Sequence, residues 1–214
     1  GASGMAGHMI YYYLKEQEKY DLYTSVFRNK LNNESIICDV RKESDLIRMI
    51  KSIKPNFIIN AVGALIKESK SCPSNAILLN SWFPHILSKI SKEHNAKLIH
   101  ISTDCVFSGK QGNYSVDNFK DADDVYGRSK ALGELINDEN VTIRTSVIGP
   151  ELKKDGEGLL HWFLNQEGEI NGYANVFWSG VTTLELAKFI NKIIKKFIPG
   201  IYQLSSEEKI SKYE

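Results

Sequence analysis

The amino-acid sequence predicts an α/β protein built on a doubly wound parallel sheet. Short stretches rich in β-branched and apolar residues alternate with amphipathic stretches of helical period through 1–150, which is typical of parallel strands joined by helices. At the start of the chain a glycine-rich turn leads into an apolar helical segment, as in folds of this class that bind a dinucleotide. After residue 150 the alternation loosens. We therefore expect a Rossmann-type NAD(P)-binding domain at 1–150 and a smaller, C-terminally incomplete substrate-binding region at 151–214, interleaved with the end of that domain.

The glycine-rich turn contains Gly1, Gly4 and Gly7 and is followed by the apolar segment 9–14. Glycines let a pyrophosphate approach the backbone, and the free N–H groups at a helix start attract the anion. The turn thus predicts a phosphate loop, although a flexible leader has a similar composition. The strand that should precede such a loop is not in the sequence, and in a doubly wound sheet it would be central. We expect either missing upstream residues or a damaged sheet.

The remaining elements are read from periodicity and from turn residues. Strands, some with the turn that follows, are predicted at 20–27, 35–40, 57–63, 97–102, 141–150 and 200–205. Helices are predicted at 9–14, 46–53, 75–94, 126–136, 158–166 and 183–197, with a kink at Pro84. A polar loop at 108–124 has the length of loops that often act as functional lids.

Composition excludes several classes of protein. Lys and Arg number 27 against 26 Asp and Glu, so the net charge of +1 provides no basic field for nucleic acid. No apolar run approaches the roughly 20 residues of a membrane-spanning helix, and no secretory leader is recognisable, so we expect a cytoplasmic protein that does not bind membranes. The three cysteines are far apart and the five histidines lack ligand spacing, so no metal site is expected.

Three strand ends carry residues suited to a dinucleotide. Arg28 closes the strand that would meet the adenosine ribose, where a cation accommodates a 2′-phosphate, and this favours NADP over NAD. An exposed loop arginine is the alternative interpretation. Asp39 and Val40 end the next strand, where they would flank an adenine. The small-residue turn Ala61-Val62-Gly63 would let a cofactor lie against the backbone.

A phenol and an ammonium stand four residues apart, at Tyr126 and Lys130, in a stretch that continues as a helix. This spacing places both on one helix face. A nearby cation favours the phenolate, so we expect Lys130 to lower the pKa of Tyr126 and make it a proton donor to a substrate oxygen. The pair alone also fits a solvated lysine beside a half-buried tyrosine. Ser102-Thr103-Asp104 ends strand 97–102, where a hydroxyl would hold a substrate carbonyl oxygen; an ordinary polar turn is the alternative.

Several segments together resemble one family. They are Gly1-Ala2-Ser3-Gly4-Met5-Ala6-Gly7, Asn60-Ala61-Val62-Gly63, Ile101-Ser102-Thr103-Asp104-Cys105-Val106-Phe107-Ser108-Gly109, Tyr126-Gly127-Arg128-Ser129-Lys130, Ile143-Arg144-Thr145-Ser146 and the stretch 178–187. On these segments the chain resembles extended short-chain dehydrogenase/reductases of the dTDP-4-dehydrorhamnose reductase branch, and the resemblance covers nearly the whole chain. It departs from that branch at Cys105, where an aromatic residue is common, and near Val147, where a Trp is common.

The resemblance implies reduction of the 4-keto group of a nucleotide-activated deoxy sugar with NADPH, or alternatively NADH. Tyr126 would protonate the keto oxygen, Lys130 would hold the nicotinamide ribose, and Thr103 would orient the carbonyl. By the same resemblance the cofactor would contact Gly1, Gly4, Met5, Asp39, Ala61 and Val62. The substrate pocket would begin at Asp104, Cys105 and Val106.

Two other functions stay open at this point. The first is a sugar-nucleotide epimerase or dehydratase of the same superfamily, which would retain tightly bound NAD. The second is a non-catalytic NADP-binding regulatory subunit. The expected partners are a nucleotide-activated sugar and a second copy of the chain in a homodimer.

Overall fold

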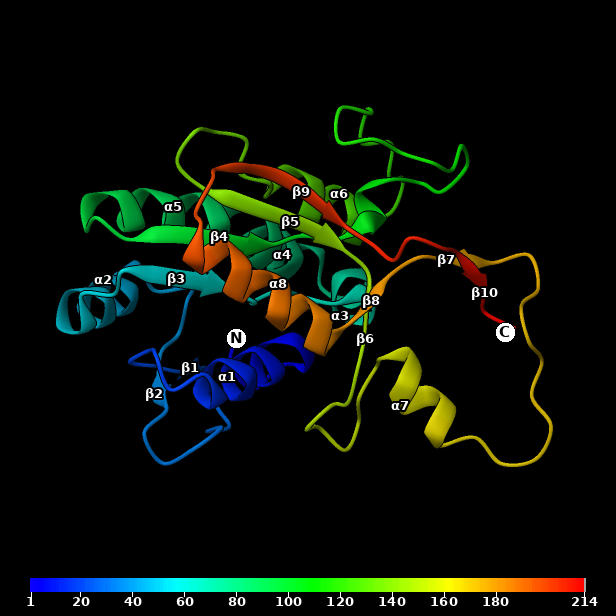
Figure 1. Ribbon diagram of the computed structural model, residues 1–214, viewed down its shortest axis with the longest axis horizontal. Coiled ribbons are helices and arrows are strands. Elements are labelled where there is room, and N and C mark those ends of the chain that lie inside the picture. Colours follow the sequence, from blue (N-terminus) through cyan, green and yellow to red (C-terminus); the bar gives the residue numbers. More distant parts are fainter. Residues whose placement is uncertain (214) are drawn as a thin grey trace.

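The structure, a computed structural model, describes residues 1–213 and contains the predicted parallel sheet (Figure 1). Four strands pair in parallel in the order β3-β4-β5-β9. They are β3 (Phe57–Asn60), β4 (Lys97–Ile101), β5 (Val141–Thr145) and β9 (Gly200–Leu204). Their β-branched residues suit a pleated, buried surface, and β5 is buried along its whole length.

Helices cover both faces of this sheet, and neighbouring residues of one strand show the division. Ile99 of β4 packs in a core cluster with Ile10 and Leu186, whereas the adjacent Leu98 packs in a second cluster with Leu46. The first face is covered by α1 (Met5–Glu16) and α8 (Thr183–Lys195), which lie side by side in Figure 1. The second is covered by α2 (Glu43–Ile53) and α5 (Phe83–Glu93).

The sheet is divided where the sequence analysis expected a central strand to be absent. β1 (Ser25–Val26) pairs in parallel with β2 (Ile36–Ile37) in a separate two-stranded sheet. A cavity of about 480 Å³ lies between this ribbon and β3 and is lined by apolar side chains that include Ile10 and Ile50. The predictions of long strands at 20–27 and 35–40 are wrong in extent, because a strand needs a ladder partner and only two residues of each have one.

The predicted helix at 75–94 is one helical stretch with a change of winding. It comprises α4 (Pro73–Ala76), a π-helical turn η1 (Ile77–Trp82) and α5. Pro84 is the second residue of α5, directly after the π-helical turn, so its missing N–H coincides with the change of winding. The other helices in this part of the chain are α3 (Ile66–Ser71), the short 3₁₀ helix η2 (Asp104–Val106) and α6 (Val125–Leu132).

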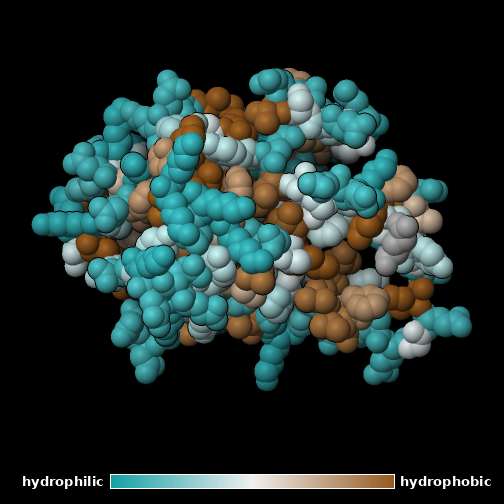
Figure 2. Space-filling model, viewed as in Figure 1, coloured by the Kyte–Doolittle hydropathy of each residue, from teal (hydrophilic) through white to brown (hydrophobic). Residues whose placement is uncertain are grey.

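The C-terminal third is interleaved with the sheet rather than separate from it, since it contributes β9 and α8. Its other elements are β6 (Val147–Ile148) paired with β8 (Val181–Thr182), the helix α7 (Leu159–Leu164), and β7 (Phe177–Trp178) paired with β10 (Ile210–Ser211). No side chain of α7 is buried, and apolar surface gathers over it in Figure 2. Within 1–213, no helix has both the length and the apolar character needed to cross a membrane.

Candidate active site

The candidate site lies at the carboxyl end of β4, where helix α6 meets η2. The Asp124 carboxylate caps α6 by accepting a hydrogen bond of 2.8 Å from Gly127 N, so the helix begins directly before Tyr126. A Cβ atom at Gly127 would lie 2.3 Å from the carbonyl oxygen of Cys105. Only glycine therefore allows α6 to pack this closely on η2.

Tyr126 lies close enough to Thr103 for the threonine side chain to affect its pKa. Burial raises the pKa of Tyr126 above its usual value, and electrostatic interactions with Cys105 and Asp104 act in the same direction. The hydrogen bond with the Thr103 side chain lowers this pKa, but the effect of burial is larger. The tyrosine is therefore a neutral phenol at pH 7 and holds its proton.

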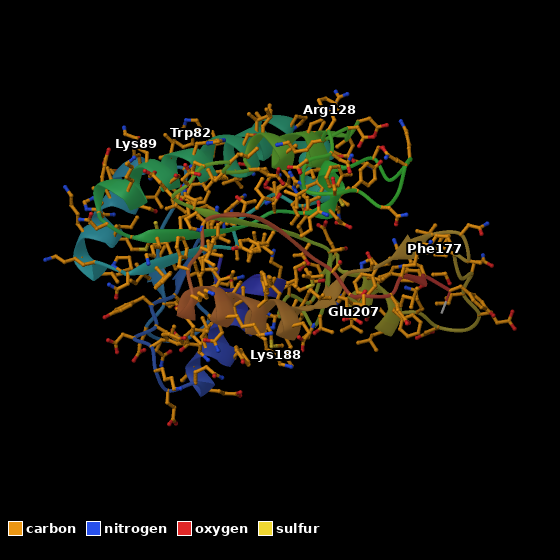
Figure 3. All side chains as sticks on the ribbon, turned by 45° about the horizontal axis from the view of Figure 1, so that its top comes forward. Trp82, Lys89, Arg128, Phe177, Lys188 and Glu207 are labelled. Atoms are coloured by element: carbon orange, nitrogen blue, oxygen red, sulfur yellow. The ribbon has the colours of Figure 1, made fainter. Side chains whose placement is uncertain are left out.

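Lys130 is 5% exposed and lies one turn after Tyr126 on α6. Its Nζ donates a hydrogen bond of 2.8 Å to the carbonyl oxygen of Ile101, the last residue of β4. Burial lowers the pKa of Lys130 to about 8, partly opposed by the charge of Glu134. The prediction that Lys130 brings the pKa of Tyr126 down is wrong here, because burial dominates both groups. Arg128, between them in sequence, projects from the outer side of the molecule (Figure 3).

Thr103 also organises the residues after β4. Its Oγ1 accepts a hydrogen bond of 3.1 Å from Cys105 N and so caps η2, and it donates one of 3.2 Å to Asp104 Oδ1. Asp104 is exposed and Cys105 is half-buried, so both side chains border the site. Val106 is 0% exposed, which corrects the expectation that it contacts substrate: it packs in the interior beneath the site.

The glycine-rich turn forms a tight cradle at the start of α1. A Cβ atom at Gly7 would lie 2.1 Å from the Gly1 carbonyl oxygen, and one at Gly1 would lie 2.5 Å from that of Ala61. Ala2 N donates to Ser25 O, so the turn lies between β1 and the end of β3. Gly4 is the N-cap of α1 and offers no capping side chain, which leaves N–H groups at the helix start for an anion. These features fit a pyrophosphate; Met5 is the first helical residue.

Two arginines gather on one aromatic ring at the ends of β1 and β2. The Cζ atoms of Arg28 and Arg41 lie 4.8 Å and 4.6 Å from the centre of the Phe27 ring. Arg41 also donates two hydrogen bonds of 2.8 Å to the Asp39 carboxylate. Sequence reasoning found Arg28 but missed Arg41, although its place two residues after Asp39 was a usable signal. Val40 packs partly against the core.

Asn80 is a second residue that sequence reasoning missed. It is fully buried in η1, and its Oδ1 accepts a hydrogen bond of 2.8 Å from Ala64 N, just after the turn that contains Val62 and Gly63. Its Nδ2 donates one of 3.1 Å to Ser129 Oγ on α6. Asn80 thereby joins the predicted cofactor turn to the helix that holds Tyr126. The signal was a polar residue within an apolar helical stripe.

The described residues contain no group of three or more His, Cys, Asp and Glu side chains arranged to hold a metal ion. A comparison with known protein families identifies the family of this chain. The RmlD substrate binding domain family matches residues 1–214. The chain belongs to this family. The membership confirms the resemblance noted from the sequence, and the RmlD-type fold accounts for the parallel sheet with helices on both faces.

The relatives of this RmlD-family chain include a methionine adenosyltransferase subunit as well as dTDP-4-dehydrorhamnose reductases. It is 28% identical to methionine adenosyltransferase 2 subunit beta of Xenopus laevis over 100% of this chain and 68% of that protein. It is 25% identical to dTDP-4-dehydrorhamnose reductase of Aggregatibacter actinomycetemcomitans over 100% of this chain and 74% of that protein. The structure of dTDP-4-dehydrorhamnose reductase from Bacillus anthracis in complex with NADP superimposes with a TM-score of 0.83 at 24% identity, covering 99% of this chain and 74% of that one.

Proposed function

We propose that this chain is an NAD(P)-dependent oxidoreductase that reduces the 4-keto group of a nucleotide-activated deoxy sugar. The observation that carries the proposal is that α6 places Tyr126 and the buried Lys130 one turn apart, with Lys130 hydrogen-bonded to Ile101 O at the end of β4, two residues before Thr103. An acid, a hydroxyl and an ammonium together suit reduction of a carbonyl, because they can orient the oxygen and supply its proton. The dTDP-4-dehydrorhamnose reductases among the relatives indicate the class of substrate.

In the proposed reaction Tyr126 donates its proton to the keto oxygen. Its raised pKa keeps the phenol neutral until the substrate oxygen becomes basic. The Thr103 hydroxyl beside it orients the carbonyl. Lys130 has a pKa of about 8 and is mostly charged at pH 7, so its ammonium stabilises the phenolate that remains. NADPH, when bound, supplies the hydride.

The cofactor is proposed to lie along the carboxyl edge of the sheet. The cradle of Gly1, Gly4 and Gly7 would hold the pyrophosphate, and the turn Ala61-Val62-Gly63 would run beside the ribose. Arg28, and with it Arg41, would bind a 2′-phosphate, which favours NADP over NAD. The Bacillus anthracis protein in complex with NADP has the same fold.

The decisive test is Tyr126→Phe, which removes the donated proton and retains the ring. We expect turnover of a dTDP- or UDP-4-keto sugar, followed by NADPH absorbance, to fall at least about 100-fold, the low end of general acid catalysis. Binding of NADPH, followed by fluorescence, should persist. Tyr12→Phe, on the exposed side of α1, is the matched control. Wild-type turnover in Tyr126→Phe would show that the catalytic assignment is wrong.

A second candidate function is a non-catalytic, NADP-binding regulatory subunit. It is favoured by the similarity to methionine adenosyltransferase 2 subunit beta, which covers the whole chain. The two candidates differ in a single observable. Binding of NADPH without turnover across a panel of dTDP- and UDP-linked 4-keto sugars would support the regulatory subunit, whereas oxidation of NADPH with any of them would support the reductase.

A further inference from the structure

Glu134 and Arg144 form an ion pair in the interior of the protein. The Glu134 side chain is 0% exposed and that of Arg144 is 3% exposed. The guanidinium donates two hydrogen bonds to the carboxylate, from Nε to Oε1 at 2.8 Å and from Nη2 to Oε2 at 2.9 Å. Removing two charges from water is costly even in a bidentate pair, so the pair is weak evidence for stability as such. Its other contacts indicate what it does.

The carboxylate of this pair connects both elements of the candidate site. Ser102 Oγ donates a hydrogen bond of 2.9 Å to Glu134 Oε1, and Ser102 directly precedes Thr103. Glu134 itself follows α6, four residues after Lys130. The same carboxylate therefore links the end of β4, which positions Thr103, to the segment that continues from the helix of Tyr126.

The pair also anchors the loop 108–124 at two points. Lys120 Nζ lies 3.1 Å from Glu134 Oε2, and Arg144 Nη1 donates a hydrogen bond of 2.9 Å to Val116 O. The Arg144 guanidinium also lies 5.1 Å from the centre of the Phe107 ring, where the loop begins. The sequence suggested that this loop is a lid. In the structure the loop contacts the buried side chains of Glu134 and Arg144 at these points.

We propose that the Glu134–Arg144 pair positions the residues of the candidate active site. The pair holds the loop 108–124 against the carboxyl edge of the sheet and keeps Thr103 close to Tyr126. Neither residue is placed to touch a substrate, so both act through the groups they hold. The catalytic part of this inference rests on the proposed reductase function. The structural part, anchoring of the loop, does not.

The test is the double variant Glu134→Leu with Arg144→Met. It removes both charges together, because a lone buried charge would destabilise the fold for a different reason. Lys92→Met with Glu139→Gln is the matched control, since that ion pair lies on the surface. Both variants are compared with the wild type by thermal unfolding, by hydrogen–deuterium exchange of 108–124, by NADPH binding and by kcat and KM.

In the Glu134/Arg144 variant we expect exchange of 108–124 to accelerate at least tenfold and kcat to fall at least tenfold, while the Kd for NADPH changes less than twofold. The control should match the wild type throughout. A folded variant with wild-type loop exchange would overturn the anchoring, and one with wild-type kcat would overturn the effect on catalysis.

If the double variant does not fold, Lys120→Met replaces it, because this side chain is 25% exposed and tolerates substitution better. Faster loop exchange in Lys120→Met supports the proposal, and unchanged exchange contradicts it. If the wild type reduces no sugar nucleotide, the reductase proposal fails, whereas loop exchange still decides whether the pair anchors the loop.

Discussion

Replacing Lys130 by methionine is expected to stabilise the protein while it abolishes reduction. The ammonium is 5% exposed, and burial lowers its pKa from 10.5 to about 8. A base whose pKa is lower in the folded than in the unfolded state opposes folding wherever it is charged. Methionine fills a similar volume without a charge. The proposed reduction therefore depends on a residue whose buried charge destabilises the fold.

The size of the effect follows from the pKa. With about 1.4 kcal/mol for each pH unit, the change to a pKa of about 8 costs about 3 kcal/mol at pH 7. The variant lacks the hydrogen bond to Ile101 O, which stabilises the wild type by about 1 kcal/mol. We expect Lys130→Met to be more stable by about 2 kcal/mol at pH 7. Well below pH 8 Lys130 is charged in both states and its burial opposes folding in full. Between pH 8 and 10.5 the folded wild type binds fewer protons than the unfolded chain, so the penalty shrinks as pH rises and the two proteins should be nearly equal at pH 10.

The assay is urea unfolding of wild type and variant at pH 7 and pH 10, with Lys92→Met as a control at an exposed lysine. The difference between the two proteins is compared at each pH, because other groups titrate equally in both. The reasoning is refuted if Lys130→Met is less stable than the wild type at pH 7, or if its advantage does not shrink as pH rises.

Three further predictions test the proposed cofactor site and the N-terminal cap of α8. Gly7→Ala should abolish NADPH binding measured by fluorescence, because its Cβ would lie 2.1 Å from the backbone oxygen of Gly1; retained affinity would exclude the cradle. Arg28→Met and Arg41→Met should each weaken binding of NADPH about tenfold, the equivalent of one charge-assisted hydrogen bond, and leave NADH unaffected; equal losses for both cofactors would exclude a 2′-phosphate site. Thr182→Ala removes the N-cap of α8 and should lower the free energy of unfolding by about 1 kcal/mol in urea titrations, and no change would show that the cap is dispensable.

Residue patterns predicted the architecture well where they depend on local periodicity. The strands at 97–101 and 141–145 and the helix α8 lie where apolar spacing placed them. The strand at 20–27 was overestimated, because β-branched composition cannot report whether a ladder partner is present. The division of the chain at residue 150 stays a prediction.

The sequence predicted which residues belong to the candidate site, but it did not predict the direction of the Tyr126 pKa shift. Helical spacing places Tyr126 and Lys130 on one face, and the structure adds that the Thr103 side chain affects the pKa of Tyr126. The direction of the phenol pKa could not be predicted, because burial is a property of the folded surroundings. Asn80 and Arg41 were missed because their roles depend on hydrogen bonds that exist only in the folded chain. Asn80 bonds to Ser129, which is distant in sequence, and Arg41 bonds to the nearby Asp39.

The packing of α1 on α8 has a consequence for biosynthesis. Helix α1 is translated well before Leu186 and Ile190, which share its core cluster. A hydrogen bond of 2.6 Å from Tyr20 to Asn191 spans 171 positions of the chain. The apolar face of α1 therefore stays uncovered until the segment that contains α8 has been translated. A nascent chain at this stage is a natural client for chaperones that shield hydrophobic segments.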